Sequence, residues 1–414
     1  MTPLYNAGIA LYRAAAKVAA LRSRKVASML KGQHAALSEL AAERQRVAPG
    51  GYDLWVHAAS LGEFEQGRPL MEQFRRKNPG ARILLSFFSP SGYEVRKNYS
   101  GADTVVYLPF DTPLASARFI EAAKPARAVF VKYEFWGNYI TRLHKLGIPV
   151  YIISAIFRPG QIFFKPWGGE FRKILHSYTH LFVQDEASAQ LLARFGVKNV
   201  SVAGDTRFDR VSDILASRRE LPEIEAFKAS SPFTLIAGSS WPQDEDMYIE
   251  WLHSHPEVKA ICAPHEFDAQ RLENLRLRLG SGAVLYSEYK TGNISPEDVQ
   301  YLIIDCFGLL SSMYRYADVA IVGGGFGAGI HNLNEAAVYG IPVVFGPRHR
   351  KFKEASDLIA CGGGYSVDSP AAGRSVLEKL LADKSARITA GRAAGAYISS
   401  HIGATDRIYK EIFI

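Results

Sequence analysis

Residues 322–337 read VGGGFGAGIHNLNEAA, and this stretch says most about the fold. The apolar run that ends at Val322 predicts a strand, the glycines predict a tight loop, and a helix is expected to begin around Asn332 or Leu333. This order of elements lets backbone amides approach a phosphate, which the helix dipole favours. Glu335 then falls in the first turns of the helix, where it could bind ribose hydroxyls. The alternative for this pattern is a glycine-rich turn before a capped helix.

Short apolar runs on both sides of this loop alternate with helical patterns, which predicts βαβ units on parallel sheets. A polar, helix-rich stretch from about Arg207 to Ser231 separates two series of strands. The first series is predicted at Leu54–Ala58, Ile83–Phe87, Thr104–Leu108, Ala128–Val131, Val150–Ser154 and Leu181–Val183, and the second at Thr234–Ala237, Ala260–Ala263, Ala283–Tyr286, Tyr301–Ile304, Val319–Val322 and Pro342–Phe345. Ligands bind beyond the carboxyl ends of such strands, so the loops of the first series should share one rim.

Length and composition agree with two globular α/β domains. The chain has 414 residues, which exceeds the size at which a single core stops growing. Hydrophobic residues make up 48% of the sequence and charged residues 22%, which excludes a disordered protein. The three cysteines are far apart and form no metal-binding pattern, so neither a disulfide framework nor a structural zinc site is supported, and a reducing cytoplasm fits.

The N-terminal segment is basic and amphipathic. Residues 1–38 hold six cations and no acid, in a chain whose formal net charge is +8. From Leu4 to Leu30 apolar residues recur at helical spacing, with Arg13 and Lys17 on the opposite face. These two cations interrupt the run too early for a spanning helix, and the charge order is unlike that of a signal peptide. We therefore expect a helix lying on an anionic membrane; the alternative is a soluble helix whose alanine-rich face packs on the domain. Nucleic-acid binding is not expected, since no such module is visible.

The motifs, taken together, resemble those of the Kdo transferases, which transfer 3-deoxy-D-manno-octulosonic acid (Kdo) to lipid A precursors. The matching segments occur in order along nearly the whole chain: HAASLGE at 57–63, KYEFWGN at 132–138, GDTRFD at 204–209, AGSS at 237–240 followed by DED at 244–246, HN at 331–332 and GP at 346–347. The forms FFSPSGYE at 87–94 and KYEFW at 132–136 are similar to the branch found in Bacteroides-type bacteria.

This resemblance implies the GT-B fold, in which two Rossmann-like domains have parallel sheets facing a central cleft. The expected division is a basic membrane-associating helix at 1–38, an acceptor domain at 39–208, a linker at 209–232 and a donor domain at 233–414, whose last helix can pack back on the first domain. It also implies a membrane enzyme, peripheral or monotopic on the cytoplasmic side of the cell inner membrane. Its partners would be the donor CMP-Kdo and a lipid A precursor.

The same resemblance assigns the donor site to the second domain. Gly324, Gly325 and Asn332 would face the phosphate, and Glu335 the ribose. Ser239 and Ser240 would meet the nucleotide from an adjacent loop. In the family's Pro-Arg-His segment this chain reads Ala263-Pro264-His265-Glu266, so His265 alone is carried over.

Inverting transfer requires a carboxylate base near the acceptor, while amides and cations can stabilise the leaving phosphate without a metal. The family resemblance favours Glu39, the first acid of the chain, as the base. Glu63 in the loop after a predicted strand and Glu134 on the KYEFW loop are the other candidates, and are expected rather to orient the acceptor or the base. Arg158 could meet an acidic sugar or lipid phosphate, with a structural ion pair as the equal alternative. Neither a cofactor nor a metal is expected, and Asp244-Glu245-Asp246 is interpreted as helix N-terminal acids. His57 is expected to be a hydrogen-bonded packing residue.

Three other functions are weighed against this one. A nucleotide-sugar epimerase of the same two-lobed fold would have no use for a basic membrane helix. A nucleotide-dependent oxidoreductase would carry its glycine-rich turn after the first strand, whereas here the turn comes late in the chain. A noncatalytic binding protein is the alternative if Glu39 is not positioned for proton transfer.

Overall fold

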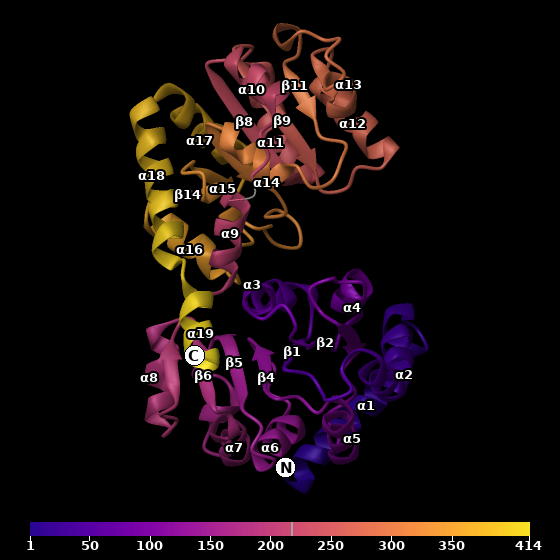
Figure 1. The fold of residues 1–414 in the computed structure, drawn as a ribbon. Coiled ribbons are helices and arrows are strands. Elements are labelled where there is room, and N and C mark those ends of the chain that lie inside the picture. Colours follow the sequence, from indigo (N-terminus) through magenta and orange to yellow (C-terminus); the bar gives the residue numbers. More distant parts are fainter. Residues whose placement is uncertain (217) are drawn as a thin grey trace. The chain divides into compact units, whose positions relative to one another are not determined.

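The computed structural model describes residues 1–216 and 218–414; residue 217 lies in the predicted linker and outside the described part. The chain divides into two compact units, Met1–Asp209 with Gly403–Ile414 and Arg210–Ile402. Each unit has a seven-stranded sheet in which all the paired strands are parallel (Figure 1). All twelve predicted strands are present, and the α/β class predicted from the sequence is confirmed.

The sheet of the first unit has the order β3-β2-β1-β4-β5-β6-β7. Its strands are β1 (Leu54–Ala58), β2 (Ile83–Phe87), β3 (Thr104–Tyr107), β4 (Ala128–Val131), β5 (Val150–Ala155), β6 (His180–Val183) and β7 (Val200–Val202). The helices are α1 (Pro3–Ala20), α2 (Arg24–Val47), α3 (Leu61–Lys77), α4 (Pro90–Arg96), α5 (Pro113–Ala123), α6 (Gly137–Lys145), α7 (Gly169–Ser177), α8 (Glu186–Arg194) and α19 (Ala404–Phe413), with a 3-10 turn at Ile162–Phe164.

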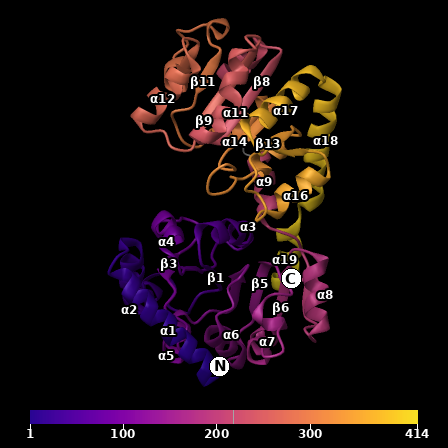
Figure 2. The ribbon, with the colours of Figure 1, turned by 180° about the vertical axis from the view of Figure 1, so that it is seen from behind.

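Both faces of this sheet are covered by helices, so successive strand residues enter different cores. Trp55 of β1 packs in the core that includes residues of α5 and α6, whereas Val56 packs in the core that includes residues of α3 and α19. The β1 strand is buried throughout, His57 included. The last helix, α19, thus returns to the first unit, as the sequence analysis allowed (Figure 2).

The N-terminal segment forms two helices, which corrects the single helix expected over Leu4–Leu30. The chain breaks after α1, and Ser23 caps α2 by accepting a hydrogen bond from the Val26 amide (3.4 Å). Because a serine side chain at this position satisfies a free helix amide, it favours a new helix start. The predicted boundary at residue 38 falls inside α2, and α1 and α2 belong to the first unit and lie side by side (Figures 1 and 2).

The sheet of the second unit has the order β10-β11-β9-β8-β12-β13-β14. Its strands are β8 (Phe233–Ser240), β9 (Val258–Pro264), β10 (Ala283–Leu285), β11 (Tyr301–Ile303), β12 (Val319–Val322), β13 (Val343–Phe345) and β14 (Gly364–Ser366). The helices are α10 (Pro222–Ala229), α11 (Pro242–His253), α12 (Ala269–Leu279), α13 (Tyr286–Tyr289), α14 (Leu310–Met313), α15 (Asn334–Ala337), α16 (Lys353–Ala360), α17 (Pro370–Ala382) and α18 (Lys384–His401), with 3-10 turns at Pro296–Asp298 and Tyr314–Tyr316, while α9 (Arg207–Ala216) crosses the boundary between the units.

Each sheet reverses its direction of winding between two central strands. In the first unit the chain moves outward from β1 to β2 and β3, then returns to place β4 on the other side of β1. In the second unit β8 and β12 hold the corresponding positions. The loops after two such strands separate to opposite faces, which leaves an opening at the carboxyl edge where ligands bind in open α/β sheets.

Candidate functional site

In the first unit, the reversal point brings two carboxylates to the carboxyl ends of β1 and β4. These strands pair directly, with His57 opposite Phe130. Glu63 lies in the first turn of α3, just after β1, and Glu134 lies just after β4. Lys132, between β4 and Glu134, has a left-handed backbone with φ of 62°. Such a conformation costs about 1–3 kcal/mol and is typical of functional sites.

Glu63 is held by the turn that starts α3. Ser60 caps the helix and accepts a hydrogen bond from the Glu63 amide (3.4 Å), while the Glu63 Oε2 accepts one from the Ala59 amide (2.6 Å). Burial, and then the neighbouring charge of Glu134, raise the pKa of Glu63 to about 8. A carboxyl group with this pKa can accept a proton near neutral pH and hold it more tightly than an ordinary glutamate.

Glu134 belongs to a buried network that extends across the sheet. Its Oε2 lies 2.9 Å from the His57 Nε2, and the indole of Trp136 donates to the same oxygen. On the other side of the ring, His57 Nδ1 lies 2.9 Å from the Ser86 hydroxyl, which accepts a hydrogen bond from the Trp55 indole (2.8 Å). A neutral ring satisfies these bonds when Ser86 donates to Nδ1 and Nε2–H donates to Glu134. The prediction of a hydrogen-bonded packing histidine is therefore confirmed, and the ring also fixes the Glu134 carboxylate.

Glu39 does not lie at this edge of the sheet. It lies well inside the length of α2, and its side chain is exposed to solvent. The side chain lines a hollow together with Lys97, Asp103 and Val105. This hollow borders the start of β3. Seven residues before Glu39, Gly32 of α2 lies against Tyr107, which ends β3, so α2 runs from the carboxyl end of that strand toward its amino end. The helix therefore carries Glu39 toward the amino ends of the strands, so the structure does not bring it together with Glu63 and Glu134, and its role as the base stays a prediction.

Arg158 follows β5 in an exposed turn. Its backbone amide donates to the Gln161 side chain (3.0 Å), and its guanidinium forms no ion pair with any residue of 1–216 or 218–414. The structural alternative of an ion pair is therefore not found among the described residues, and a role in acceptor binding stays a prediction.

In the second unit, the reversal point brings together the loops after β8 and β12. The glycines allow this contact: a Cβ on Gly323 would lie 2.3 Å from the carbonyl oxygen of Ser239. Similarly, a Cβ on Gly325 would lie 2.5 Å from the amide nitrogen of Gly346, in the loop after β13. These two glycines are therefore required for close approach of backbone to backbone. Ser239 has a φ of 53°, so this edge of the sheet also carries a strained non-glycine residue.

The amide of Gly324 is already occupied, which corrects its predicted contact with a phosphate. The buried carboxylate of Asp244 accepts hydrogen bonds from the amides of Gly324 (2.8 Å) and Trp241 (2.9 Å). Asp244 indeed lies in the first turn of α11, as interpreted, but its charge is used to hold the glycine loop. The amides of Gly325 and Phe326 donate to no residue in the described part of the chain. These two can still meet an anion.

The helix expected after the loop is a single turn, α15, and it begins at Asn334. Asn332 precedes it and donates a side-chain hydrogen bond to Glu335 (3.0 Å), so these two predicted residues are brought together. The Ser240 hydroxyl, in contrast, is buried and lies near Glu245 and Tyr248 (3.4 Å each). Its predicted contact with a nucleotide through the hydroxyl is corrected, because the side chain points into the core.

His265 forms part of a stack of rings from three loops. Its ring stacks on Trp241 with centroids 4.7 Å apart and on His331 with centroids 4.4 Å apart. Burial, and then the neighbouring His265, lower the pKa of His331 to about 4, so that ring is neutral at pH 7. Trp241 and His331 were absent from the predicted site. Their positions directly after β8 and in the loop after β12 were the available signal, since both loops end at the carboxyl edge.

Comparisons with known proteins agree with the unit architecture and with the motifs. Residues 23–210 match the sequence model of the family described as 3-deoxy-D-manno-octulosonic-acid transferase (kdotransferase). A 3-deoxy-D-manno-octulosonic acid transferase of Bordetella pertussis is 28% identical over 378 residues, covering 87% of this chain and 86% of its own. One from Aquifex aeolicus is 27% identical over 341 residues, covering 80% and 86%.

Solved structures of similar fold include both transferases and epimerases. MurG of Acinetobacter baumannii has a TM-score of 0.56 at 13% identity, covering 87% of this chain and 98% of its own. UDP-GlcNAc 2-epimerase of Neisseria meningitidis has a TM-score of 0.57 at 14% identity, covering 86% and 98%. At such low identity these structures show the fold alone, which is the predicted GT-B fold. Residues 23–210 thus match the Kdo transferase family model, the chain is similar to Kdo transferases over most of its length, and these homologues indicate a glycosyltransferase.

Proposed function

We propose that this glycosyltransferase transfers Kdo from CMP-Kdo to a sugar hydroxyl of a lipid A precursor, with inversion at the anomeric carbon. The observation that carries the proposal is Glu63, a carboxyl group with a pKa of about 8 at the reversal point of the first sheet. Inverting transfer needs a base that can take one proton from the acceptor as its oxygen attacks, and a base is most effective when its pKa is close to the working pH.

In the proposed step, Glu63 takes the proton of the acceptor hydroxyl while its oxygen bonds to the anomeric carbon of Kdo. The bond from that carbon to the phosphate oxygen breaks, and CMP leaves. Glu134 does not take the proton, because its carboxylate is already engaged by His57 and Trp136. Its fixed negative charge instead raises the affinity of Glu63 for a proton.

The second unit is proposed to bind the donor. The amides of Gly325 and Phe326 face no internal acceptor, and hydrogen bonds from such amides can stabilise a leaving phosphate without a metal. Glu335, oriented by Asn332, is proposed to accept hydrogen bonds from ribose hydroxyls. The stack of Trp241, His265 and His331 offers flat rings against which a cytosine base can pack.

We further propose that α1 rests on the cytoplasmic face of the inner membrane. The apolar residues predicted to form one face of the helix are exposed: Leu4 is 81% accessible, Leu11 72%, Val18 67% and Leu21 85%. Ala16, on another side of the helix, is buried against the domain. Within residues 1–216 and 218–414, the helices are too short or too polar to cross a bilayer. An exposed apolar stripe beside cations is typical of a helix lying in a membrane interface.

The test is a reaction of the purified protein with CMP-Kdo and a tetraacylated lipid A precursor. We expect release of CMP, formation of a Kdo-lipid product with inverted anomeric configuration by NMR, and no loss of rate with a chelator. A retained configuration would contradict the single displacement. Formation of an epimerised nucleotide sugar without any Kdo-lipid would instead favour the epimerase alternative, for which the fold is the only support.

A further inference from the structure

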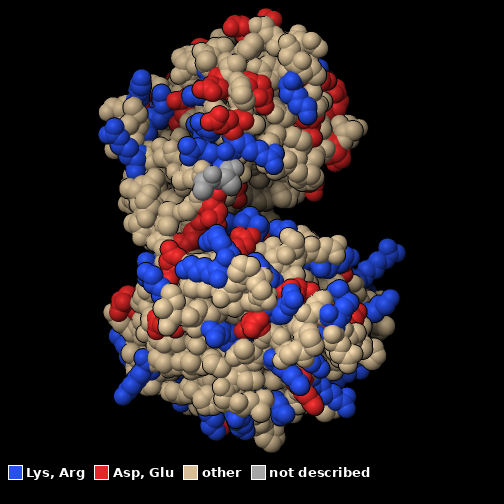
Figure 3. Space-filling view, viewed as in Figure 1, with Lys and Arg blue, Asp and Glu red and all other residues tan. Residues whose placement is uncertain are grey.

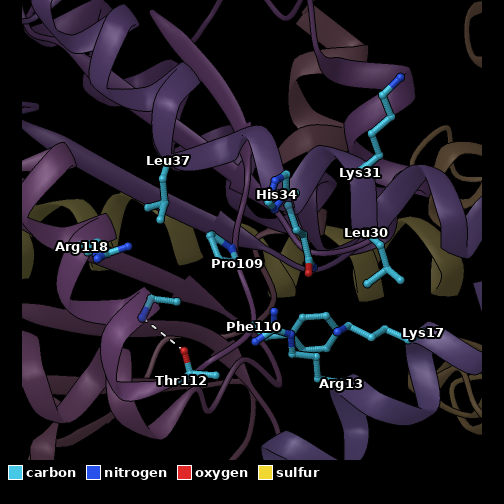
Figure 4. Close-up of a pocket in the computed structure, with 12 residues that line it drawn as sticks. Arg13, Lys17, Leu30, Lys31, His34, Leu37, Pro109, Phe110, Thr112 and Arg118 are labelled. Atoms are coloured by element: carbon cyan, nitrogen blue, oxygen red, sulfur yellow. Dashed lines mark hydrogen bonds between the residues drawn. The ribbon is translucent and has the colours of Figure 1, made fainter.

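A cavity of about 760 Å³ opens in the first unit between α1, α2 and the start of α5 (Figure 4). Four cations line it: Arg13 and Lys17 from α1, Lys31 from α2 and Arg118 from α5. No aspartate or glutamate is among the lining residues, and none of the four cations forms an ion pair within the described chain. By contrast, acidic and basic side chains are mixed on the face of this unit seen in Figure 3.

All four cations are exposed, and with no acid among the lining residues they give the cavity a positive potential that attracts an anion. A second observation points to a ligand that also accepts or donates hydrogen bonds. Gln33 lines the cavity and is only 7% exposed, yet neither its side-chain nitrogen nor its oxygen has a hydrogen-bond partner in the described structure. A buried amide without partners costs roughly 1–3 kcal/mol, and a bound polar group would remove that cost.

The start of α5 adds to the positive potential of the cavity. Thr112 lines it and caps α5, an eleven-residue helix. A helix N-terminus carries a partial positive charge and stabilises anions. The cavity therefore combines four cations, a helix N-terminus and an unpaired amide, which suits the oxygens of a phosphate.

Apolar side chains complete the lining and distinguish a lipid from free phosphate as the source. Leu30, Leu37 and Phe110 line the same cavity as the cations. The exposed apolar residues Leu11 and Val18 lie on α1, the helix that supplies Arg13 and Lys17. A headgroup in the cavity could therefore keep its acyl chains beside apolar surface.

The cavity is connected to the candidate catalytic carboxylates by touching rings. Phe110, which lines the cavity, contacts Phe88 with centroids 5.5 Å apart, and Phe88 contacts Trp136 at 4.8 Å. Trp136 in turn donates its indole hydrogen bond to Glu134. A headgroup held in the cavity would thus be separated from the carboxylate network by a short row of aromatic side chains.

We propose that this cavity binds the phosphate of a lipid headgroup, and that Gln33 is one of its hydrogen-bonding groups. The inference deepens the proposed function, since a lipid acceptor and its membrane would both present such phosphates. Its test measures lipid binding in the absence of the sugar donor. A protein that binds the lipid but does not transfer Kdo can therefore be distinguished from one that does not bind the lipid in this cavity.

The experiment measures co-sedimentation with neutral phosphatidylcholine vesicles doped with either phosphatidic acid or oleate, matched in surface charge. At roughly 0.5 M salt, exposed charges are screened within a few ångströms. The pocket variant Arg13→Gln/Arg118→Gln is compared with Arg22→Gln/Arg24→Gln, which removes two exposed cations that do not line the cavity. We expect the pocket variant to lose about tenfold or more of its phosphatidic acid binding, because charged hydrogen bonds are lost, while the control stays near wild type.

The variant Gln33→Met separates the ligand contact from folding. Replacing an unpaired buried amide by an apolar side chain should raise the melting temperature of the free protein, while binding to phosphatidic acid vesicles falls several-fold. Equal losses in both double variants, or equal binding to phosphatidic acid and oleate, would overturn the proposal. Thermal stabilisation by inorganic phosphate as strong as that by short-chain phosphatidic acid would contradict the lipid as the source.

Discussion

The two sheets share a reversal of winding at their centre but present different chemistry there. Between β1 and β4, the first sheet places two carboxylates, and one of them has a strongly raised pKa. Between β8 and β12, the second sheet places a glycine loop whose nearby carboxylate, Asp244, is occupied by two backbone amides. The same topology thus places a buried carboxyl pair in one unit, where we propose the base, and a glycine loop in the other, where we propose the site of an anion. The difference arises from loop residues, because the strands only determine where the loops meet.

The largest expected effect tests whether the first reversal point carries the base. Glu63→Gln should lower kcat by about 10²–10⁴-fold, since no group then takes the proton from the hydroxyl of the lipid acceptor. Glu39→Gln is the matched control and should stay close to wild type, because Glu39 is exposed away from this edge. Both are measured by CMP release at saturating substrates. A loss in the Glu39 variant as large as in the Glu63 variant would contradict the site described here.

The second reversal point is tested by separating its loops. A Cβ on Gly346 would lie 2.6 Å from the carbonyl carbon of Gly325, so Gly346→Ala must push the loops apart. Overpacking of this kind costs about 1–3 kcal/mol, and we expect KM for the donor to rise by up to about a hundredfold, with a smaller change in kcat. Gly327→Ala is the control, since its Cβ would meet only ordinary contacts, the nearest at 3.7 Å. Equal effects in both variants would argue against loop contact as the cause.

The pH dependence sharpens the contrast between the two carboxylates of the first unit. We expect kcat/KM to rise with pH and level off above about 8, where Glu63 is deprotonated. Glu134→Gln removes the neighbouring negative charge and should move this midpoint to lower pH. A pH–rate profile of both proteins measures the shift. An unchanged midpoint would mean that Glu134 does not act on Glu63.

Glu63 also makes the stability of the fold depend on pH, in the opposite direction from a carboxylate held in a salt bridge. The pKa of Glu63 is raised from 4.5 to about 8 on folding, so between these values the folded protein binds more protons than the unfolded one. Stability from this residue is therefore present below pH 4.5 and is lost as pH rises toward 8. Melting curves should show Glu63→Gln gaining stability over wild type as the pH is raised from 5 to 8. A gain independent of pH would contradict the raised pKa.

The smallest effect concerns the network behind the carboxylates. Ser86→Ala removes the hydroxyl that bonds Trp55 and His57 in the buried sheet. We expect a loss of about 1–3 kcal/mol in the free energy of unfolding, measured in urea, because two buried groups lose a partner. If the network fixes Glu134, Ser86→Ala should also shift the pH–rate midpoint. The control is Thr405→Val, at a helix start far along the chain from this network, which should leave that midpoint unchanged.

The sequence predicted the central strands well and missed one of the two edge strands of each sheet. β7 and β14 have three residues each and are partly exposed, as Val202 shows with 41% accessibility. A short edge strand needs no long apolar run, because only one of its sides pairs with the sheet. The central strands are buried on both faces and therefore have the continuous apolar pattern that sequence analysis recognises.

The site was predicted in outline, but the residue favoured as the base lies apart from the other two carboxylates. Glu63 and Glu134 were recognised because each follows a strand, and the structure brings them together. Glu39 was favoured through the family resemblance, but the register of α2 against β3 places it toward the other end of the sheet. Similarly, nothing in the sequence showed that Asp244 would occupy the Gly324 amide, since that contact joins loops eighty positions apart.

The sequence by itself determined the α/β class, the buried strands, the family resemblance and the residues that follow each strand, because local apolar patterns and motifs carry these. Only the tertiary structure decided which strands became neighbours at the reversal points. That order fixes which loops meet, which carboxylate is buried beside another charge and which amide is already bonded. Those properties depend on distances between residues far apart in the chain, and no local pattern encodes them.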